Sequence, residues 1–342
     1  MTTVMTHSRG VHEMGPAVIA IGVFDGVHLG HQTLVRDAID NARTREVASC
    51  VLTFDRDPDQ IVTPGQAAPQ LTSLEDKIAF LRSIGPDAIL VVRFDEWLAA
   101  LTPADFCVDV LLDAAEPVAC MVGHDFRFGS GASGDAATLR ALGEIHHFEV
   151  ITHPLVRAAG AVVTSTRIRS LVSRGDVAGA AMLLGRPHRL QGTVVRGRGA
   201  GQGLGTPTAN LDVDPRLALP APGVYAAWAT VGPHRHPAAV SVGIPPMFPE
   251  ATCLLEAHLI GFQGDLYGQR IIVEFVDRLR EQRTFPDQEG LAEAISVDVR
   301  LVSDLLSRSE NPKEGPVDEG LEVDLTPITG KDEPKDASLR SE

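Results

Sequence analysis

The first half of the chain alternates short apolar runs with stretches of helical periodicity, and this alternation most constrains its fold. Strands and helices that alternate at this spacing favour an α/β domain with a doubly wound parallel sheet. The expected strands are Ala17–Val23, Ala48–Phe54, Ala88–Phe94, Pro117–Val122 and Glu149–His153. The expected helices are His31–Arg45, Ser73–Ile84, Pro103–Asp113, Ala136–Ile145 and Arg167–Arg174.

The pattern changes after Gly185-Arg186-Pro187, where short strands separated by glycine and proline turns begin. One helix is expected there, over Glu289–Ser307. These features predict a small antiparallel β-barrel with a terminal helix. The expected strands are Gln191–Arg196, Gly223–Val231, Ala238–Val242, Cys253–Phe262 and Arg270–Phe275.

A chain of 342 residues is long enough for two domains with additional segments. We expect a loose leader over residues 1–15, an α/β domain over 16–186 and a β domain over 187–308. Residues 309–342 are acidic and proline-containing with few large apolar side chains, so we expect a disordered tail.

The net charge of −15 argues against a general binder of nucleic acid or of anionic membranes. No apolar run approaches the length of a transmembrane helix, and the first sixteen residues lack the apolar core of a signal peptide. The four cysteines show no metal-binding spacing, and we interpret them as reduced, mostly buried thiols of a cytoplasmic protein. The oligomeric state is left open.

The segment Gly22–Gln32 reads as the end of a strand, a tight turn and the start of a helix. Such a turn directs backbone N–H groups and the positive end of a helix dipole at one place, which favours a phosphate. Gly26 and Gly30 allow close backbone approach. His28 and His31 can add two donors toward the same anion.

Two other segments of the first domain carry polar groups at the ends of expected strands. Gly123–Gly129 follows a strand and contains Asp125 and Phe126. Thr164–Arg169 opens a helix in which Ser165 and Thr166 are suitable N-cap residues, with Arg169 about one turn further on. Hydroxyls, N–H groups and a guanidinium at one helix start can bind a polyphosphate.

The second domain contains a glycine-rich loop, followed by Thr208 and Asn210, whose small oxygen groups suit Mg²⁺ beside a nucleotide. Glu256 stands in an otherwise apolar strand. It could act as a general base toward a hydroxyl that attacks a γ-phosphate, or it could be structural and pair with an arginine such as Arg280. The residues alone leave both interpretations open.

The order of these motifs resembles the bacterial bifunctional riboflavin kinase/FAD synthetase family over roughly residues 16–300. The first turn carries the H-x-G-H signature of nucleotidyltransferases. The matching segments are Gly22–Gln32, Gly123–Gly129, Ser165–Arg169, Leu184–Arg186, Gly205–Asn210, Gly223–Tyr225, Glu256, Leu266–Gly268 and Leu279–Arg280.

The resemblance implies two consecutive reactions. The C-terminal barrel would phosphorylate riboflavin with MgATP to give FMN, and the N-terminal nucleotidyltransferase domain would adenylylate FMN with a second ATP to give FAD and pyrophosphate. Mg²⁺, ATP, riboflavin and FMN are thus the implied cofactor and substrates, with no nucleic acid or membrane partner.

The resemblance also implies roles for individual residues. Implied catalytic residues are His28, His31 and Arg169 in the first domain and Glu256, as the base, in the second. Implied nucleotide-binding residues are Gly22, Phe24, Asp25, Gly30, Ser165, Thr166, Gly205, Thr208 and Asn210. Thr208 and Asn210 would also bind the metal. Implied flavin-binding residues are Phe54, Asp125, Phe126 and Phe128.

The chain departs from the family pattern at two places. Asp57 stands where a histidine is usual, which bears on nucleotide handling in adenylyl transfer. Ile244 and Met247 replace two threonines of the barrel, which bears on flavin positioning in the kinase. The phosphate-binding residues and Glu256 remain, so we expect both activities. The alternatives are an enzyme that retains one activity and a non-catalytic flavin- or nucleotide-binding regulator.

Overall fold

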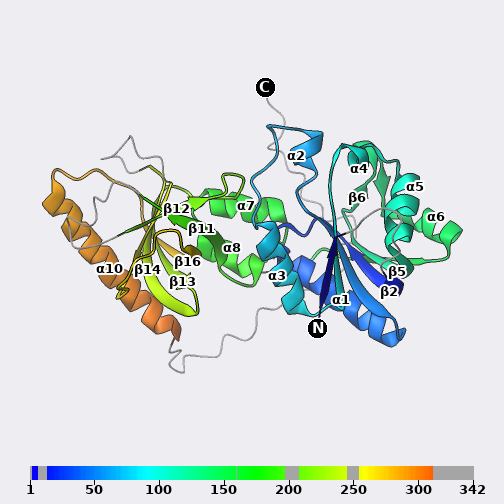
Figure 1. Ribbon diagram of the computed structural model, residues 1–342, viewed down its shortest axis with the longest axis horizontal. Coiled ribbons are helices and arrows are strands. Elements are labelled where there is room, and N and C mark those ends of the chain that lie inside the picture. The colour runs from blue at the N-terminus through cyan, green and yellow to red at the C-terminus, as the bar shows by residue number, and fades with distance from the viewer. Residues whose placement is uncertain (1, 7–13, 159, 197–207, 245–253, 311–342) are drawn as a thin grey trace.

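The computed structural model describes residues 2–6, 14–158, 160–196, 208–244 and 254–310. Figure 1 shows an N-terminal domain built around a sheet, a C-terminal barrel, and the helix α10 on the outer side of the barrel. The expected division into an α/β part and a β part is confirmed.

The N-terminal domain contains a six-stranded sheet in the order β1-β4-β3-β2-β5-β8, and all of its strand pairs are parallel. The strand order reverses beside β2, and in open parallel sheets ligands bind beyond the carboxyl ends of the strands at such a point. The strands are β1 (Thr3–Thr6), β2 (Met14–Ile21), β3 (Ala48–Phe54), β4 (Ala88–Val92), β5 (Ala115–Gly123) and β8 (Glu149–His153).

Helices cover both faces of this sheet, as expected for a doubly wound domain. Side chains of α1 and α3 pack with alternate residues of β2, such as Val18 and Ala20, in one core cluster. Side chains of α5, η2 and α6 pack with Ala17, Ile19 and Ile21 in the other. The bounds are η1 (Asp25–Val27), α1 (Leu29–Thr44), α2 (Asp59–Val62), α3 (Leu74–Ile84), α4 (Glu96–Ala100), α5 (Pro103–Phe106), η2 (Cys107–Leu112), η3 (Ser130–Ala132), α6 (Ala136–His146), α7 (Ser165–Ser173) and α8 (Val177–Leu184). Short hairpins are β6 (Arg127–Phe128) with β7 (Gly134–Asp135), and β9 (Arg157–Ala158) with β10 (Ala161–Val162).

The C-terminal domain is a closed barrel in the order β11-β12-β15-β14-β13-β16 with antiparallel pairing throughout. Leu190, Val240 and Phe275 are among the buried side chains of its core. Val302 and Leu306 of the terminal helix pack against Trp228 on the outer side. The elements are β11 (His188–Val195), β12 (Ala209–Val213), β13 (Gly223–Val231), β14 (His234–Val242), β15 (Leu255–Leu259), β16 (Arg270–Arg280) and α10 (Gln288–Glu310).

Some expectations need correction. Residues 1–15 are not a loose leader throughout, because Thr3–Thr6 form the edge strand β1 beside β4. The helix expected over Pro103–Asp113 is α5 continued by a π-helical turn, η2. Helix α10 runs to Glu310, so only residues 311–342 of the expected tail remain, and they lie outside the described residues.

The two domains contact each other through the segment Gln70–Asp76. Gln70 forms a bridge with Leu217, and its carbonyl accepts the backbone N–H of Ala218 at 2.7 Å. Asp76 of α3 pairs with Arg189 of β11. The same stretch of chain therefore borders both domains.

The described helices include none that is long and apolar enough to cross a bilayer. Cys50, Cys107 and Cys120 are buried, as expected. Burial raises the pKa of Cys120 well above its usual range. Cys253 lies outside the described residues.

Candidate functional site

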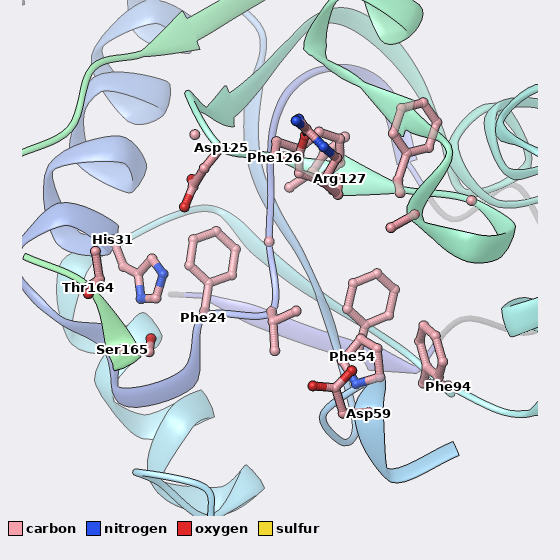
Figure 2. Close-up of a pocket in the computed structure, with 18 of the residues that line it drawn as sticks. Phe24, His31, Phe54, Asp59, Phe94, Asp125, Phe126, Arg127, Thr164 and Ser165 are labelled. Carbon is pink, nitrogen blue, oxygen red and sulfur yellow. The ribbon is translucent and has the colours of Figure 1, made fainter. Parts of the chain in front are cut away.

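A cavity of about 970 Å³ opens at the carboxyl ends of the parallel strands. Its walls come from the segments that follow β2, β5 and β8 and from the first turn of α7. Figure 2 shows His31, Thr164 and Ser165 on one side of this pocket and aromatic side chains on the other. Most of the site residues predicted for the first domain line this cavity, at the strand ends where a ligand was expected.

The turn between β2 and α1 has an unusual backbone. Phe24, Gly26 and Val27 all have positive φ angles, of 54°, 80° and 40°. Such values are rare for a β-branched residue such as Val27, so the surrounding structure must hold this turn in place. A side chain at position 26 would also meet Leu71 at 2.8 Å, which explains the glycine there.

His28 and His31 lie together at the start of α1. Their rings stack with centroids 3.5 Å apart, and the Nδ1 atom of His28, the N-cap residue, accepts the backbone N–H of His31 at 3.3 Å. Both line the pocket. The helix thus begins at Leu29, two residues before the expected start, because His28 supplies its cap.

Burial keeps both histidines neutral. It lowers the pKa of His28 to about 3 and that of His31 well below its usual range, and the charge of Arg186 acts in the same direction on both. The Nδ1 atom of His31 is buried and, within the part of the chain that is described, has no hydrogen-bond partner. A neutral imidazole can donate one N–H to a phosphate oxygen.

The start of α7 forms the wall beside these histidines, since Thr164, Ser165 and Thr166 all line the pocket. The N-cap residue is Thr164, whose hydroxyl accepts the backbone N–H of Arg167 at 3.2 Å, and not Ser165 or Thr166 as expected. The Ser165 hydroxyl instead donates to the carbonyl of Asp25 at 2.9 Å. Ser165 therefore connects the start of α7 to the turn between β2 and α1, the two segments predicted to bind phosphate.

Asp25 and Arg169 form an ion pair with 2.8 Å between Oδ2 and Nη2. The Asp25 carboxylate is buried and also accepts the backbone N–H groups of Leu71 and Thr72. Neither Asp25 nor Arg169 is among the residues that line the cavity. In this structure they join three segments behind the turn, whereas the sequence suggested direct contacts with the nucleotide.

Asp57, which replaces the usual histidine, lies next to this ion pair. Its carboxylate is 3.8 Å from the guanidinium of Arg169. The departure therefore adds a negative charge beside the only arginine that the sequence assigned to the nucleotide. We find the charge close to the pocket, since the next two residues, Pro58 and Asp59, line it.

Two cations near the turn were not among the predicted site residues. The buried Lys77 donates to the carbonyls of Val23 at 3.0 Å and Phe54 at 2.6 Å, and burial lowers its pKa to about 8. Arg186 donates to the carbonyls of Gly26 and Val27. A lone lysine in a helix and an arginine at a domain boundary carry no periodic signal. Arg186 lies in a segment that carries the resemblance, whereas no sequence signal indicated Lys77.

The other end of the pocket is aromatic. Phe54 and Phe94 meet edge to face at 5.5 Å, and Phe126 stacks on Phe128 at 5.3 Å. Asp125 also lines the cavity, and Figure 2 shows it on the same side as His31, away from Phe54 and Phe94. Of the four residues that the resemblance assigned to flavin, all line this cavity. Phe94 was not predicted, although it ends the expected strand Ala88–Phe94.

In the barrel, strand register brings together the residues predicted for the second reaction. Asn210 of β12 pairs with Glu256 of β15, and Glu256 pairs on its other side with Ser241 of β14. These three side chains are partly buried, while the alternating neighbours Leu255 and Ala257 lie in the barrel core. They therefore share the outer face of the barrel wall.

Other predicted residues of the barrel lie around this group. Thr208 directly precedes β12, and Gly205 and Met247 lie outside the described residues. Arg280, the suggested structural partner of Glu256, forms an ion pair with Asp298 of α10 at 2.6 Å. No cluster of three or more His, Cys, Asp or Glu side chains arranged for a metal occurs within the described ranges.

Comparison with known proteins assigns both domains. Residues 11–167 match the family described as FAD synthetase, and residues 184–306 match the family described as riboflavin kinase. A bifunctional riboflavin kinase/FMN adenylyltransferase from Pseudomonas fluorescens is 35% identical over 306 residues, which cover 88% of this chain and 98% of that protein. The protein of the same name from Escherichia coli K12 is 33% identical over 296 residues, covering 85% and 94%.

A solved structure supports the complete two-domain fold. It is described as a macrolide-efflux protein from Streptococcus pneumoniae and is 27% identical, with a TM-score of 0.78 and coverage of 88% of this chain and 98% of that one. Both domain matches occur here in one chain, and the names of the relatives include both activities. The chain therefore belongs to the family of bifunctional riboflavin kinase/FMN adenylyltransferases and is an enzyme with both activities.

Proposed function

We propose that the pocket of the N-terminal domain binds ATP and FMN together and carries out adenylyl transfer. The observation that carries this proposal is the two-ended cavity. One end presents neutral His28 and His31 and the first turn of α7, and the other end presents four phenylalanines. The polar end suits the triphosphate, and the aromatic end suits the flat flavin ring.

In this reaction a phosphate oxygen of FMN attacks the α-phosphorus of ATP, and the bond from that phosphorus to the bridging oxygen of pyrophosphate breaks. Catalysis of such a transfer depends mainly on positioning and on stabilising negative charge. The histidine N–H groups and the N-terminus of α7 would donate to the phosphate oxygens. The Asp25–Arg169 ion pair lies behind the turn and would help to hold these donor groups in position.

In the barrel, Glu256 would accept the proton of the ribityl 5′-hydroxyl of riboflavin as that oxygen attacks the γ-phosphate of ATP. Asn210, its register partner, and Thr208 would bind the nucleotide phosphates. The hydroxyl and amide oxygens of these two residues, beside a carboxylate, are hard donors that fit Mg²⁺. When bound with ATP, Mg²⁺ would neutralise phosphate charge.

We propose residues 16–186 and 187–308 as the two functional domains, and the matched ranges 11–167 and 184–306 support a division of the chain into two parts. We also propose a cytoplasmic location, where the buried Cys50, Cys107 and Cys120 would stay reduced. The assignment of ATP, riboflavin and FMN as the partners, without nucleic acid, agrees with the net charge of −15.

One assay tests the proposal. Purified protein is incubated with ATP, Mg²⁺ and either riboflavin or FMN, and chromatography separates riboflavin, FMN and FAD. Formation of FMN followed by FAD supports both sites. FMN without FAD, or FAD from supplied FMN only, would show that one site is inactive, and no product would favour a binding protein.

A further inference from the structure

Side chains donate hydrogen bonds to the carbonyl oxygens of the turn Asp25–Val27, which precedes the histidines. The Ser165 hydroxyl donates to the carbonyl of Asp25, and the Arg186 guanidinium donates to those of Gly26 at 2.5 Å and Val27 at 3.1 Å. Gln32 also donates to the Val27 carbonyl, at 2.9 Å. Consecutive carbonyls of the turn are thus bound by side chains.

Two of these donors connect the turn to the end of α8. Arg186 and Gln32 each donate to the Val27 carbonyl and also to the Leu184 carbonyl at the end of α8. Gly26 and Val27 are the residues whose left-handed conformations lead directly into His28. Because Val27 is β-branched and adopts this conformation at a cost, the contacts to its carbonyl help to stabilise the conformation.

Arg186 is itself fixed by packing. Its guanidinium carbon lies 3.6 Å from the centroid of the Phe80 ring on α3, so the ring covers one face of the cation. The neighbouring Arg189 lies over the same ring at 4.6 Å but pairs with Asp76. The two arginines therefore share an environment, and of the two, Arg186 is the one with hydrogen bonds to the turn.

The position of Arg186 in the chain is unexpected for such a role. The FAD synthetase match ends at residue 167, and Arg186 falls within the riboflavin kinase match that begins at residue 184. Arg186 is the last residue of the proposed first domain and also lies inside the kinase match, so a residue at the junction of the two domains supports the turn.

We propose that Arg186 is a positioning residue for adenylyl transfer, which holds the Gly26–Val27 peptide groups so that His28 and His31 meet the triphosphate. This inference rests on the proposed role of those histidines. On this proposal, formation of FAD depends on Arg186, a residue at the junction with the kinase domain. Formation of FMN does not depend on it.

The test uses the full chain with Arg186→Ala and Arg186→Lys, and measures the two reactions separately. We expect Arg186→Ala to lower kcat/KM for FMN adenylylation on the order of 10- to 100-fold, because small displacements of positioned groups have effects of this size. FMN formation from riboflavin should stay within about twofold. Added guanidinium ion at millimolar concentration should restore part of the adenylylation in Arg186→Ala. Arg186→Lys should be intermediate.

Arg189→Gln is the matched control, because Arg189 shares the Phe80 ring without contacting the turn. It should retain adenylylation. Unchanged adenylylation in Arg186→Ala would overturn the proposal, and so would equal losses in Arg186→Ala and Arg189→Gln without guanidinium rescue. If the alanine variant does not fold, the lysine variant decides, and wild-type kcat/KM in it would overturn the proposal. Activity of a His28→Ala/His31→Ala variant would instead refute the proposed histidine role.

Discussion

The Nδ1 atom of His28 accepts the backbone N–H of His31, and the two rings stack 3.5 Å apart at an interplanar angle of 14°. This arrangement fixes one nitrogen of His28 as an acceptor and so leaves its other ring nitrogen to carry the proton of the neutral form. The pair is thus a neutral hydrogen-bonding unit at a helix N-terminus, and several of its consequences can be measured.

We predict that replacing both His28 and His31 with alanine abolishes FAD formation and leaves FMN formation intact. Loss of one preorganised donor typically lowers kcat about 10²- to 10³-fold, and two are lost here. The measurement is chromatography of products from riboflavin and from FMN, with the exposed His234 changed to alanine as the control. Loss of both reactions would contradict independent sites.

The buried neutral histidines predict acid sensitivity of the fold. A histidine with a folded pKa far below 6.5 binds its proton more readily when unfolded, so stability is lost as pH falls from about 6.5 toward the folded pKa. His188, buried with a pKa of about 4, should contribute about 1.5 kcal/mol to the loss of unfolding free energy between pH 6.5 and 5.

Denaturant unfolding of the wild type and His188→Gln at these two pH values tests this contribution. The wild type should lose more unfolding free energy than the variant over the same pH range. An identical pH dependence in the two proteins would show that His188 does not titrate differently in the folded and unfolded states.

We predict that Glu256→Gln stops FMN formation while FMN supplied directly still becomes FAD. The amide cannot accept the hydroxyl proton, and loss of a general base costs about 10²- to 10⁴-fold in rate. Glu274→Gln is a suitable control, because Glu274 lies on another strand of the same barrel and pairs with Arg235. Undiminished kinase turnover in Glu256→Gln would remove the base role.

Asp57→His should increase kcat/KM of adenylyl transfer for ATP. The change removes a carboxylate 3.8 Å from Arg169 and adds a side chain that can donate to phosphate. Asp57→Asn separates the two effects, since it removes the charge without adding an imidazole. Steady-state kinetics with varied ATP measure the change, and a fall in kcat/KM for both variants would show that the carboxylate is needed.

Truncation after Glu310 should leave both reaction rates within about twofold, because α10 and its contacts with the barrel remain. The measurement compares both rates in the truncated and full-length proteins. A large fall in either rate would assign a function to residues 311–342.

Much of the fold could be predicted because it follows from local patterns. The strands Ala48–Phe54, Glu149–His153 and Gly223–Val231 have the predicted bounds, since each contains apolar or β-branched residues and is followed by a charged residue, a proline or a glycine. The edge strand β1 was missed because four residues carry too little periodicity, and its pairing with β4 is a tertiary contact.

The candidate site divides in the same way. Motif spacing along the chain was enough to predict a turn suited to phosphate, a second helix start and an aromatic segment at strand ends. The pairing of Asp25 with Arg169 behind the turn, and the hydrogen bonds of Lys77 and Arg186 to carbonyls of the strand ends and of the turn, became visible in the folded chain. The physical reason is that a buried carbonyl takes whichever donor folding brings beside it, and sequence spacing does not encode that choice.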